Sequence, residues 1–123
     1  MTTIVHFEIP ADDVERAKKF YSELFGWKIE KAPGPMDYWM IETTNEKGEK
    51  ALGGGLMKRP NPESKISNYI GVSSVDEHTK KIEAAGGKTL VQKTAVPGTG
   101  YWAMFLDTEN NVFAIFEENK NAK

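Results

Sequence analysis

The sequence predicts one α+β domain built from two repeats of the order strand, helix, strand, strand, strand. Three observations lead to this prediction. Segments with apolar residues at every second position alternate with two segments in which apolar residues recur at helical spacing. The pair Tyr38-Trp39 returns 63 residues later as Tyr101-Trp102, and His6 and Tyr69 share this offset. The chain has 123 residues, which is the size of one ordinary domain.

The first repeat begins with a strand expected over Ile4–Ile9 and ended by Pro10. A helix is expected over Asp12–Phe25, since Asp12 followed by Glu15 is typical of a helix N-terminus. Gly26 is suited to the left-handed backbone that closes a helix. The apolar stripe of this helix consists of Val14, Ala17, Phe20, Tyr21 and Leu24. Three further strands are expected over Trp27–Lys31, Tyr38–Thr43 and Ala51–Lys58.

The second repeat follows a segment rich in proline and polar residues at 59–65, which we interpret as a linker. The predicted elements are a strand over Asn68–Ser74, a helix over Val75–Ala85, and strands over Lys88–Gln92, Tyr101–Leu106 and Val112–Glu117. We therefore expect a single domain over 1–123, with one module at about 3–58 and the other at about 66–118.

Composition excludes several classes of function. The chain contains no cysteine, which excludes a disulfide scaffold, a thiolate metal site and a cysteine nucleophile. Two histidines, His6 and His78, are too few for three imidazole ligands from one chain. With a net charge of −2 and no basic stripe, we expect no nucleic-acid partner. Because no apolar segment has the length of a membrane span and no signal-like start is present, we expect a cytoplasmic protein without a membrane partner.

His6 and Glu8 are the first candidate site residues. In an alternating strand they share one face, while Val5, Phe7 and Ile9 share the other and are expected to pack under the helix. The pair is interpreted in three ways: a catalytic base with its orienting carboxylate, two metal ligands, or a partly solvated pair on an open sheet face. His78 is expected to be a solvent-exposed helix residue without a functional role.

Aromatic and methionine side chains predict an apolar wall beside this pair. Alternation places Ala114 and Phe116 on the site-facing side of the last strand and leaves Phe113 and Ile115 for the core. The predicted ligand-binding residues are His6, Glu8, Met40, Tyr69, Met104 and Phe116. The run Gly53-Gly54-Gly55 lacks the lysine and helix of a phosphate loop, so we expect it to bend its strand or to let a ligand or another chain approach the backbone.

The sequence resembles the vicinal oxygen chelate superfamily, which includes glyoxalase I, bleomycin-resistance proteins and extradiol dioxygenases. The segment FYSELFGW at Phe20–Trp27 carries the resemblance most specifically. Further matching segments are Val5–Ile9, Tyr69–Val72, Glu83–Gly87, Phe105–Asp107 and Ala114–Glu117. The resemblance implies two modules of mixed strand direction, each curled into half of a cup with its helix outside. It also implies a homodimer.

The resemblance further implies four metal-ligand positions, on the first and fourth strands of each module. These positions match His6, then Gly54 or Gly55, then Tyr69 and Ala114. Glycine and alanine offer no side-chain donor, and tyrosine, with a pKa near 10, is a poor ligand for a divalent metal. Only His6 is retained, so we expect no metal and no other cofactor. A divalent metal held by an unusual ligand set stays the alternative.

Three functions follow from these observations. The first is a glyoxalase-like protein that binds a small organic ligand in an aromatic-lined cup without the standard metal. The second is a metal-dependent lyase, isomerase or dioxygenase with a ligand set that includes His6 and Glu8. The third is a metal-independent enzyme with His6 as its base, or an interaction module. The substitution His6→Ala separates them, since it abolishes activity in an enzyme and only weakens ligand binding in the first case.

Overall fold

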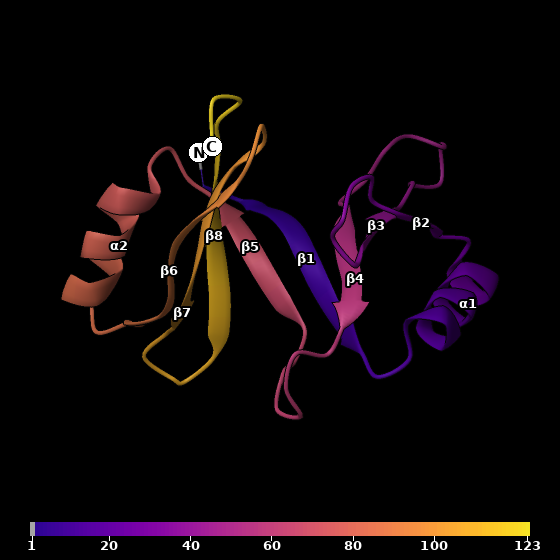
Figure 1. Cartoon of the computed structure of the whole chain (residues 1–123), viewed down its shortest axis with the longest axis horizontal. Helices are drawn as coiled ribbons and strands as arrows, with labels where there is room; N and C mark the ends of the chain where they lie inside the picture. Colours follow the sequence, from indigo (N-terminus) through magenta and orange to yellow (C-terminus); the bar gives the residue numbers. More distant parts are fainter. Residues whose placement is uncertain (1) are drawn as a thin grey trace. The chain divides into compact units, whose positions relative to one another are not determined.

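The computed structural model describes residues 2–123, which divide into two compact units. One unit is His6–Ile66, and the other joins the segment that ends at Val5 to Ser67–Lys123. The elements are β1 (Ile4–Ala11), α1 (Val14–Phe25), β2 (Lys28–Lys31), β3 (Tyr38–Glu42), β4 (Gly54–Lys58), β5 (Ser67–Gly71), α2 (Val75–Ala84), β6 (Lys88–Val96), β7 (Gly100–Leu106) and β8 (Val112–Glu118), as labelled in Figure 1. The predicted repeat of strand, helix and three strands is confirmed.

The strands of the first unit lie in the order β2-β3-β4-β1. Strand β1 pairs with β4 in parallel, and the other two pairs are antiparallel. Ile9 and Ala11 are buried together with residues of β2, β3 and β4, and Val14 and Tyr21 of α1 pack against this cluster. Because one face of β1 is committed to the helix, His6 and Glu8 lie on the opposite, helix-free face, as the alternation predicts.

The second unit repeats this topology, with strand order β5-β8-β7-β6 and a parallel β5–β8 pair. Its core consists of Val75, Ala103, Phe105 and Ile115, with Ile70, Ile82 and Phe113 packed against it. The expected α+β class with strands of both directions and one helix packed against each module is therefore confirmed. Phe113 and Ile115 contribute to the core, and Ala114 and Phe116 alternate with them, as predicted.

The N-cap of helix α1 lies one residue later in the chain than predicted. Asp13, rather than Asp12, is the N-cap, and its carboxylate accepts a hydrogen bond from the backbone N–H of Arg16 at 3.1 Å. Asp12 instead accepts a hydrogen bond from Arg59 Nε at 2.9 Å. A capping side chain must stand directly before the first helical residue, here Val14. The C-cap is as predicted, since Gly26 is left-handed with φ 70°.

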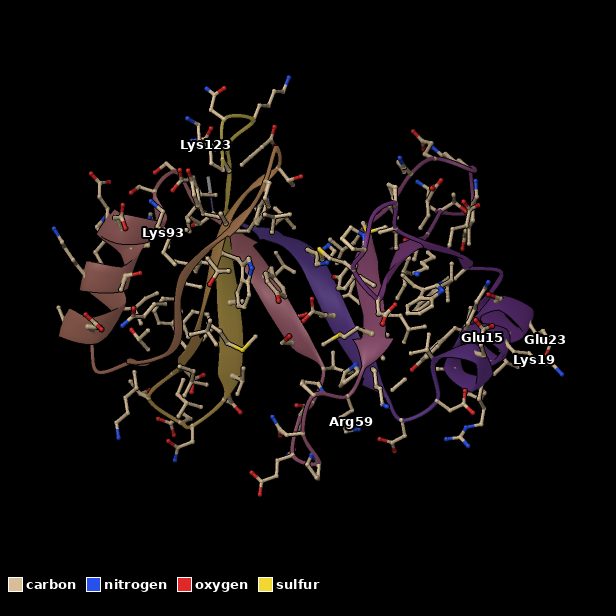
Figure 2. The ribbon with its side chains drawn as sticks, viewed as in Figure 1. Glu15, Lys19, Glu23, Arg59, Lys93 and Lys123 are labelled. Carbon is tan, nitrogen blue, oxygen red and sulfur yellow. The ribbon has the colours of Figure 1, made fainter. Side chains whose placement is uncertain are left out.

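The apolar stripe of α1 is wider than the surface that the strands cover. Val14, Ala17 and Tyr21 pack against the core, whereas Phe20 and Leu24 are 55% and 60% exposed. Two of the five residues of the predicted apolar stripe therefore lie outside this core. Opposite the stripe, α1 carries the exposed charged residues Glu15, Lys19 and Glu23 (Figure 2). These are spaced four residues apart, so they share one solvated side of the helix.

Other boundaries differ by a few residues. Strand β1 continues through Pro10 to Ala11, because the fixed φ of proline suits extended backbone and the strand loses only one N–H donor. Strand β6 reaches Val96 through two register shifts rather than ending at Gln92. Over residues 2–123, neither helix has the length and apolar character that crossing a membrane requires.

Candidate functional site

A hydrogen-bonded chain of three side chains occupies the helix-free face of the first unit. The hydroxyl of Tyr38, on β3, lies 2.7 Å from His6 Nε2 and donates a hydrogen bond to Glu8 Oε2 at 3.0 Å. All three side chains are partly buried. The imidazole and phenol rings are nearly parallel, with an interplanar angle of 17° and centroids 6.3 Å apart. The predicted pair of His6 and Glu8 is thus joined by a third residue.

Gly55 makes this arrangement possible. It pairs with Glu8 across the β1–β4 ladder and with Met40 across the β3–β4 ladder, so it faces the same side as Glu8. A Cβ built on Gly55 would overlap the hydroxyl and ring of Tyr38. A Cβ on the preceding Gly54 would instead meet Phe7, on the helix-covered face. The tyrosine therefore reaches His6 and Glu8 through space that any larger residue at position 55 would fill.

The proton count fixes the direction of the chain. A phenol has one proton, and Tyr38 donates it to Glu8. The contact between Tyr38 and His6 is then a hydrogen bond only if Nε2 carries a proton and donates it to the phenol oxygen. In neutral His6 this assignment leaves the lone pair on Nδ1. The chain therefore runs from His6 through Tyr38 to Glu8 and sets the tautomer of the imidazole.

Burial also sets the charge of His6. Partial removal from water disfavours the imidazolium and lowers the pKa of His6 below its ordinary value of 6.5. At neutral pH the ring is therefore neutral. A neutral imidazole in a fixed tautomer offers one donor and one acceptor, so this side chain is suited to orienting a ligand or accepting a proton.

The helix-free face of the second unit is apolar and aromatic. Tyr69 pairs with Ala114, which pairs with Met104, so these three residues form one row across β5, β8 and β7. Phe116 pairs with Trp102 in the next row. The rings of Tyr69 and Trp102 meet edge to face with centroids 6.5 Å apart. The predicted residues Tyr69, Met104 and Phe116 share this face, and Trp102 joins them.

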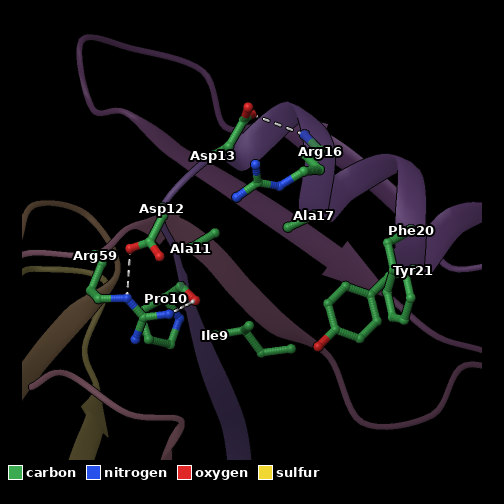
Figure 3. Close-up of a pocket in the computed structure, with 10 residues that line it drawn as sticks. All are labelled: Ile9, Pro10, Ala11, Asp12, Asp13, Arg16, Ala17, Phe20, Tyr21 and Arg59. Atoms are coloured by element: carbon green, nitrogen blue, oxygen red, sulfur yellow. Dashed lines mark hydrogen bonds and ion pairs between the residues drawn. The ribbon is translucent and has the colours of Figure 1, made fainter. Parts of the chain in front are cut away.

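A pocket of about 360 Å³ lies elsewhere in the first unit, between the end of β1 and the start of α1 (Figure 3). Arg59 lines it, but its guanidinium is already bound by Asp12, by the carbonyl of Pro10 at 3.5 Å and by the carbonyl of Ser64. These bonds tie the segment after β4 to the end of β1. The pocket is open, and its arginine is already paired within the fold. We therefore assign Arg59 a structural role.

Comparison with known proteins gives the family. Residues 3–44 match the family described as Bleomycin resistance protein-like N-terminal. A glyoxylase-like domain-containing protein of Didymella fabae is 35% identical over 112 residues, which cover 88% of both chains. The chain belongs to the glyoxalase-like family of the vicinal oxygen chelate superfamily. The resemblance noted from the sequence is therefore confirmed.

More distant relatives agree with this assignment. The anthracycline biosynthesis protein DnrV of Streptomyces peucetius is 25% identical over 126 residues, which cover 91% of this chain and 46% of that protein. The chain thus spans about half the length of this relative. The solved structure of a Streptomyces coelicolor methylmalonyl-CoA epimerase bound to 2-nitronate-propionyl-CoA superposes with a TM-score of 0.70 at 14% identity, covering 100% and 99% of the two chains. This likeness supports the fold alone.

The residues at the four expected metal-ligand positions do not fit the superfamily's metal. Of the two candidate glycines only Gly55 faces the side of His6, and the phenol of Tyr38 occupies the space beside it. Ala114 is fully buried without a donor, and its neighbour Tyr69 is a phenol. Within residues 2–123, no three histidine, aspartate or glutamate side chains gather closely enough to hold a metal ion.

Tyr38 is the site residue that the sequence prediction omits. Its contact with His6 spans 32 positions in the chain, and alternation alone shows only that it shares a face with Met40. The sequence feature that points to this contact is the run Gly53-Gly54-Gly55. We expected this run to let a ligand or another chain approach the backbone, whereas the group that approaches Gly55 is the side chain of Tyr38.

Gly55→Ala is expected to lower the free energy of unfolding by about 1–3 kcal/mol, because the new methyl group overlaps the Tyr38 hydroxyl. In a Tyr38→Ala background the three atoms nearest to the new methyl group are absent, so the same change should cost less than about 0.5 kcal/mol. Urea unfolding of the wild type, both single variants and the double variant measures this coupling. Additivity within about 0.5 kcal/mol would contradict the proposed contact.

The His6 pKa predicts a pH dependence of stability. Because the folded-state pKa lies below 6.5, the unfolded chain binds the proton first, and the unfolding free energy falls as pH drops through 6.5. The slope from one proton is at most about 1.4 kcal/mol per pH unit. Urea unfolding of wild type and His6→Gln between pH 8 and pH 5, a range of roughly three units around the histidine pKa, isolates this contribution. A wild type that gains stability relative to the variant as pH falls would refute it.

Proposed function

We propose that this protein binds a small organic molecule through the helix-free faces of its strands, without the standard metal of the superfamily. The observation that carries the proposal is the chemistry of those faces. In the first unit, His6, Tyr38 and Glu8 form a hydrogen-bonded chain, and Met40 on the same face is exposed. In the second unit, the partly exposed rings of Trp102 and Phe116 lie on the same face as Tyr69, which is 7% exposed. Ligand sites typically have apolar walls and a few polar groups that fix orientation.

The polar chain supports recognition of a hydroxyl or amine group. Glu8 and the phenol oxygen are acceptors, and neutral His6 with its proton on Nε2 carries a lone pair on Nδ1. Met40 lies on the same face as Tyr38 and is 45% exposed, so an apolar part of a ligand can contact it without displacing core residues. We propose that His6, Glu8, Tyr38 and Met40 contact the ligand in this unit.

The donor set supports the absence of the standard metal. Tight metal sites need three or four protein ligands, and position 55, position 114 and position 69 supply a glycine, an alanine and a phenol. We therefore propose no metal cofactor. Bleomycin-resistance proteins of the superfamily act by sequestering a ligand. Sequestration requires no catalytic group, so the same function is proposed for this chain. A homodimer, which the family resemblance implies, is part of the same proposal.

Metal-independent acid–base catalysis is the second candidate, and the tautomer of His6 favours it. A neutral imidazole whose Nε2–H is bound to the Tyr38 phenol carries its lone pair on Nδ1, which is the atom at which a general base would take up a proton. Substitution of His6 by alanine distinguishes the two functions. It abolishes turnover in an enzyme, whereas a binding protein retains its ligand with reduced affinity.

Intrinsic fluorescence tests the binding proposal. Trp102 lies on the helix-free side of the second unit, while Trp27 and Trp39 pack against the core of the first. A panel of planar aromatic compounds should contain members that quench the wild type, and this quenching should be absent in Trp102→Phe and retained in Trp39→Phe. A separate calorimetric titration measures binding at the first unit, where Tyr38→Phe should weaken the affinity by about 2- to 10-fold, which corresponds to one hydrogen bond.

Two results of this titration would contradict the proposal. The first is quenching that survives in Trp102→Phe but disappears in Trp39→Phe, because the ligand would then lie against the helix-covered side. The second is full binding that appears only after a divalent metal is added, because that would reinstate the metal-dependent alternative.

A further inference from the structure

We propose that Tyr38 is the specificity-determining residue that excludes divalent metals from the site and converts His6 and Glu8 into a hydrogen-bonding pair. This inference rests on the proposed metal-free function and names the residue responsible for it. It predicts that the metal-binding capacity of the first unit is suppressed by one side chain and can be restored by removing it.

Tyr38 engages both potential ligand atoms of β1. Its hydroxyl lies 2.7 Å from His6 Nε2 and 3.0 Å from Glu8 Oε2. A divalent ion would need to approach these same two atoms at roughly 2.0–2.2 Å. The phenol oxygen therefore occupies the space between the two donors that an ion would take. It is also a poor replacement ligand, because its proton is held in the bond to Glu8.

The hydrogen-bond direction adds a chemical barrier to the steric one. Nε2 of His6 carries the proton that it donates to Tyr38, so this nitrogen has no lone pair for a metal while the chain is intact. Coordination at Nε2 would require a change of tautomer and the loss of two hydrogen bonds from a partly buried phenol.

Gly55 and Tyr38 act as a pair. The position on β4 that the family resemblance assigns to a carboxylate is a buried glycine, and the space its side chain would enter holds the Tyr38 ring and hydroxyl. A carboxylate at position 55 and a tyrosine at position 38 in its present rotamer cannot coexist. The polar group of this site is thus delivered from β3 instead of β4, and it arrives as a neutral donor rather than an anion.

Cobalt(II) and zinc(II) titrations of four proteins test this inference: the wild type, Tyr38→Ala, the double variant Tyr38→Ala/Gly55→Glu, and its matched control Tyr38→Ala/Gly55→Gln. Calorimetry gives the affinities, cobalt absorption reports coordination, and circular dichroism verifies folding. The double variant should bind at least about 100-fold more tightly than the wild type, since its carboxylate completes a set with His6 and Glu8. The glutamine control should lose most of this gain, and adding His6→Ala should abolish it.

Each outcome decides a specific claim. A folded double variant that binds no better than the wild type, which itself binds weakly, overturns the role of Tyr38 and leaves the metal-free function standing. Tight binding by the wild type overturns the metal-free function. If the double variant does not fold, Tyr38→Ala alone decides, with an expected gain of about 10-fold from the release of His6 and Glu8. An unchanged affinity in that variant overturns the inference.

Discussion

The approach of the Tyr38 side chain to the bare backbone of Gly55 is the contact on which the candidate site depends. Strand β1 brings His6 and Glu8 to one face because Ile9 and Ala11 are buried on the other. These two side chains would remain an ordinary polar pair without the hydroxyl that joins them. The missing side chain at position 55 gives Tyr38 its path to both partners. One glycine thus sets the tautomer and donor pattern of the site.

The two units show how one topology can carry different chemistry. Both place a parallel pair of first and fourth strands at corresponding positions and pack one helix against the core side. The helix-free row in the first unit contains Glu8, Gly55 and Met40, whereas the corresponding region of the second contains Tyr69, Ala114 and Met104. The fold is fixed by the buried faces, so the other faces are free to differ. Membership of the superfamily therefore specifies the scaffold and leaves the reaction to these side chains.

Local patterns in the sequence predict the fold well, because strand alternation and helix spacing determine which residues are buried. They place His6 with Glu8, and Ala114 with Phe116, on the correct faces. They do not reveal that Phe20 and Leu24 are exposed, because the width of an apolar stripe does not show how much of it the neighbouring strands cover. They also miss Tyr38, whose role depends on a contact across 32 positions and on the geometry of a glycine. Such a contact leaves no periodic signal.

The tautomer of His6, observed by ¹H–¹⁵N NMR of the imidazole ring at neutral pH, tests the hydrogen-bonded chain most directly. The chain requires a neutral ring with its proton on Nε2, protected from exchange by the bond to Tyr38, and a loss of this preference in Tyr38→Phe. A proton on Nδ1 in the wild type, or a tautomer that is indifferent to Tyr38→Phe, would contradict the hydrogen-bonded chain. It would also return His6 to the set of available metal ligands.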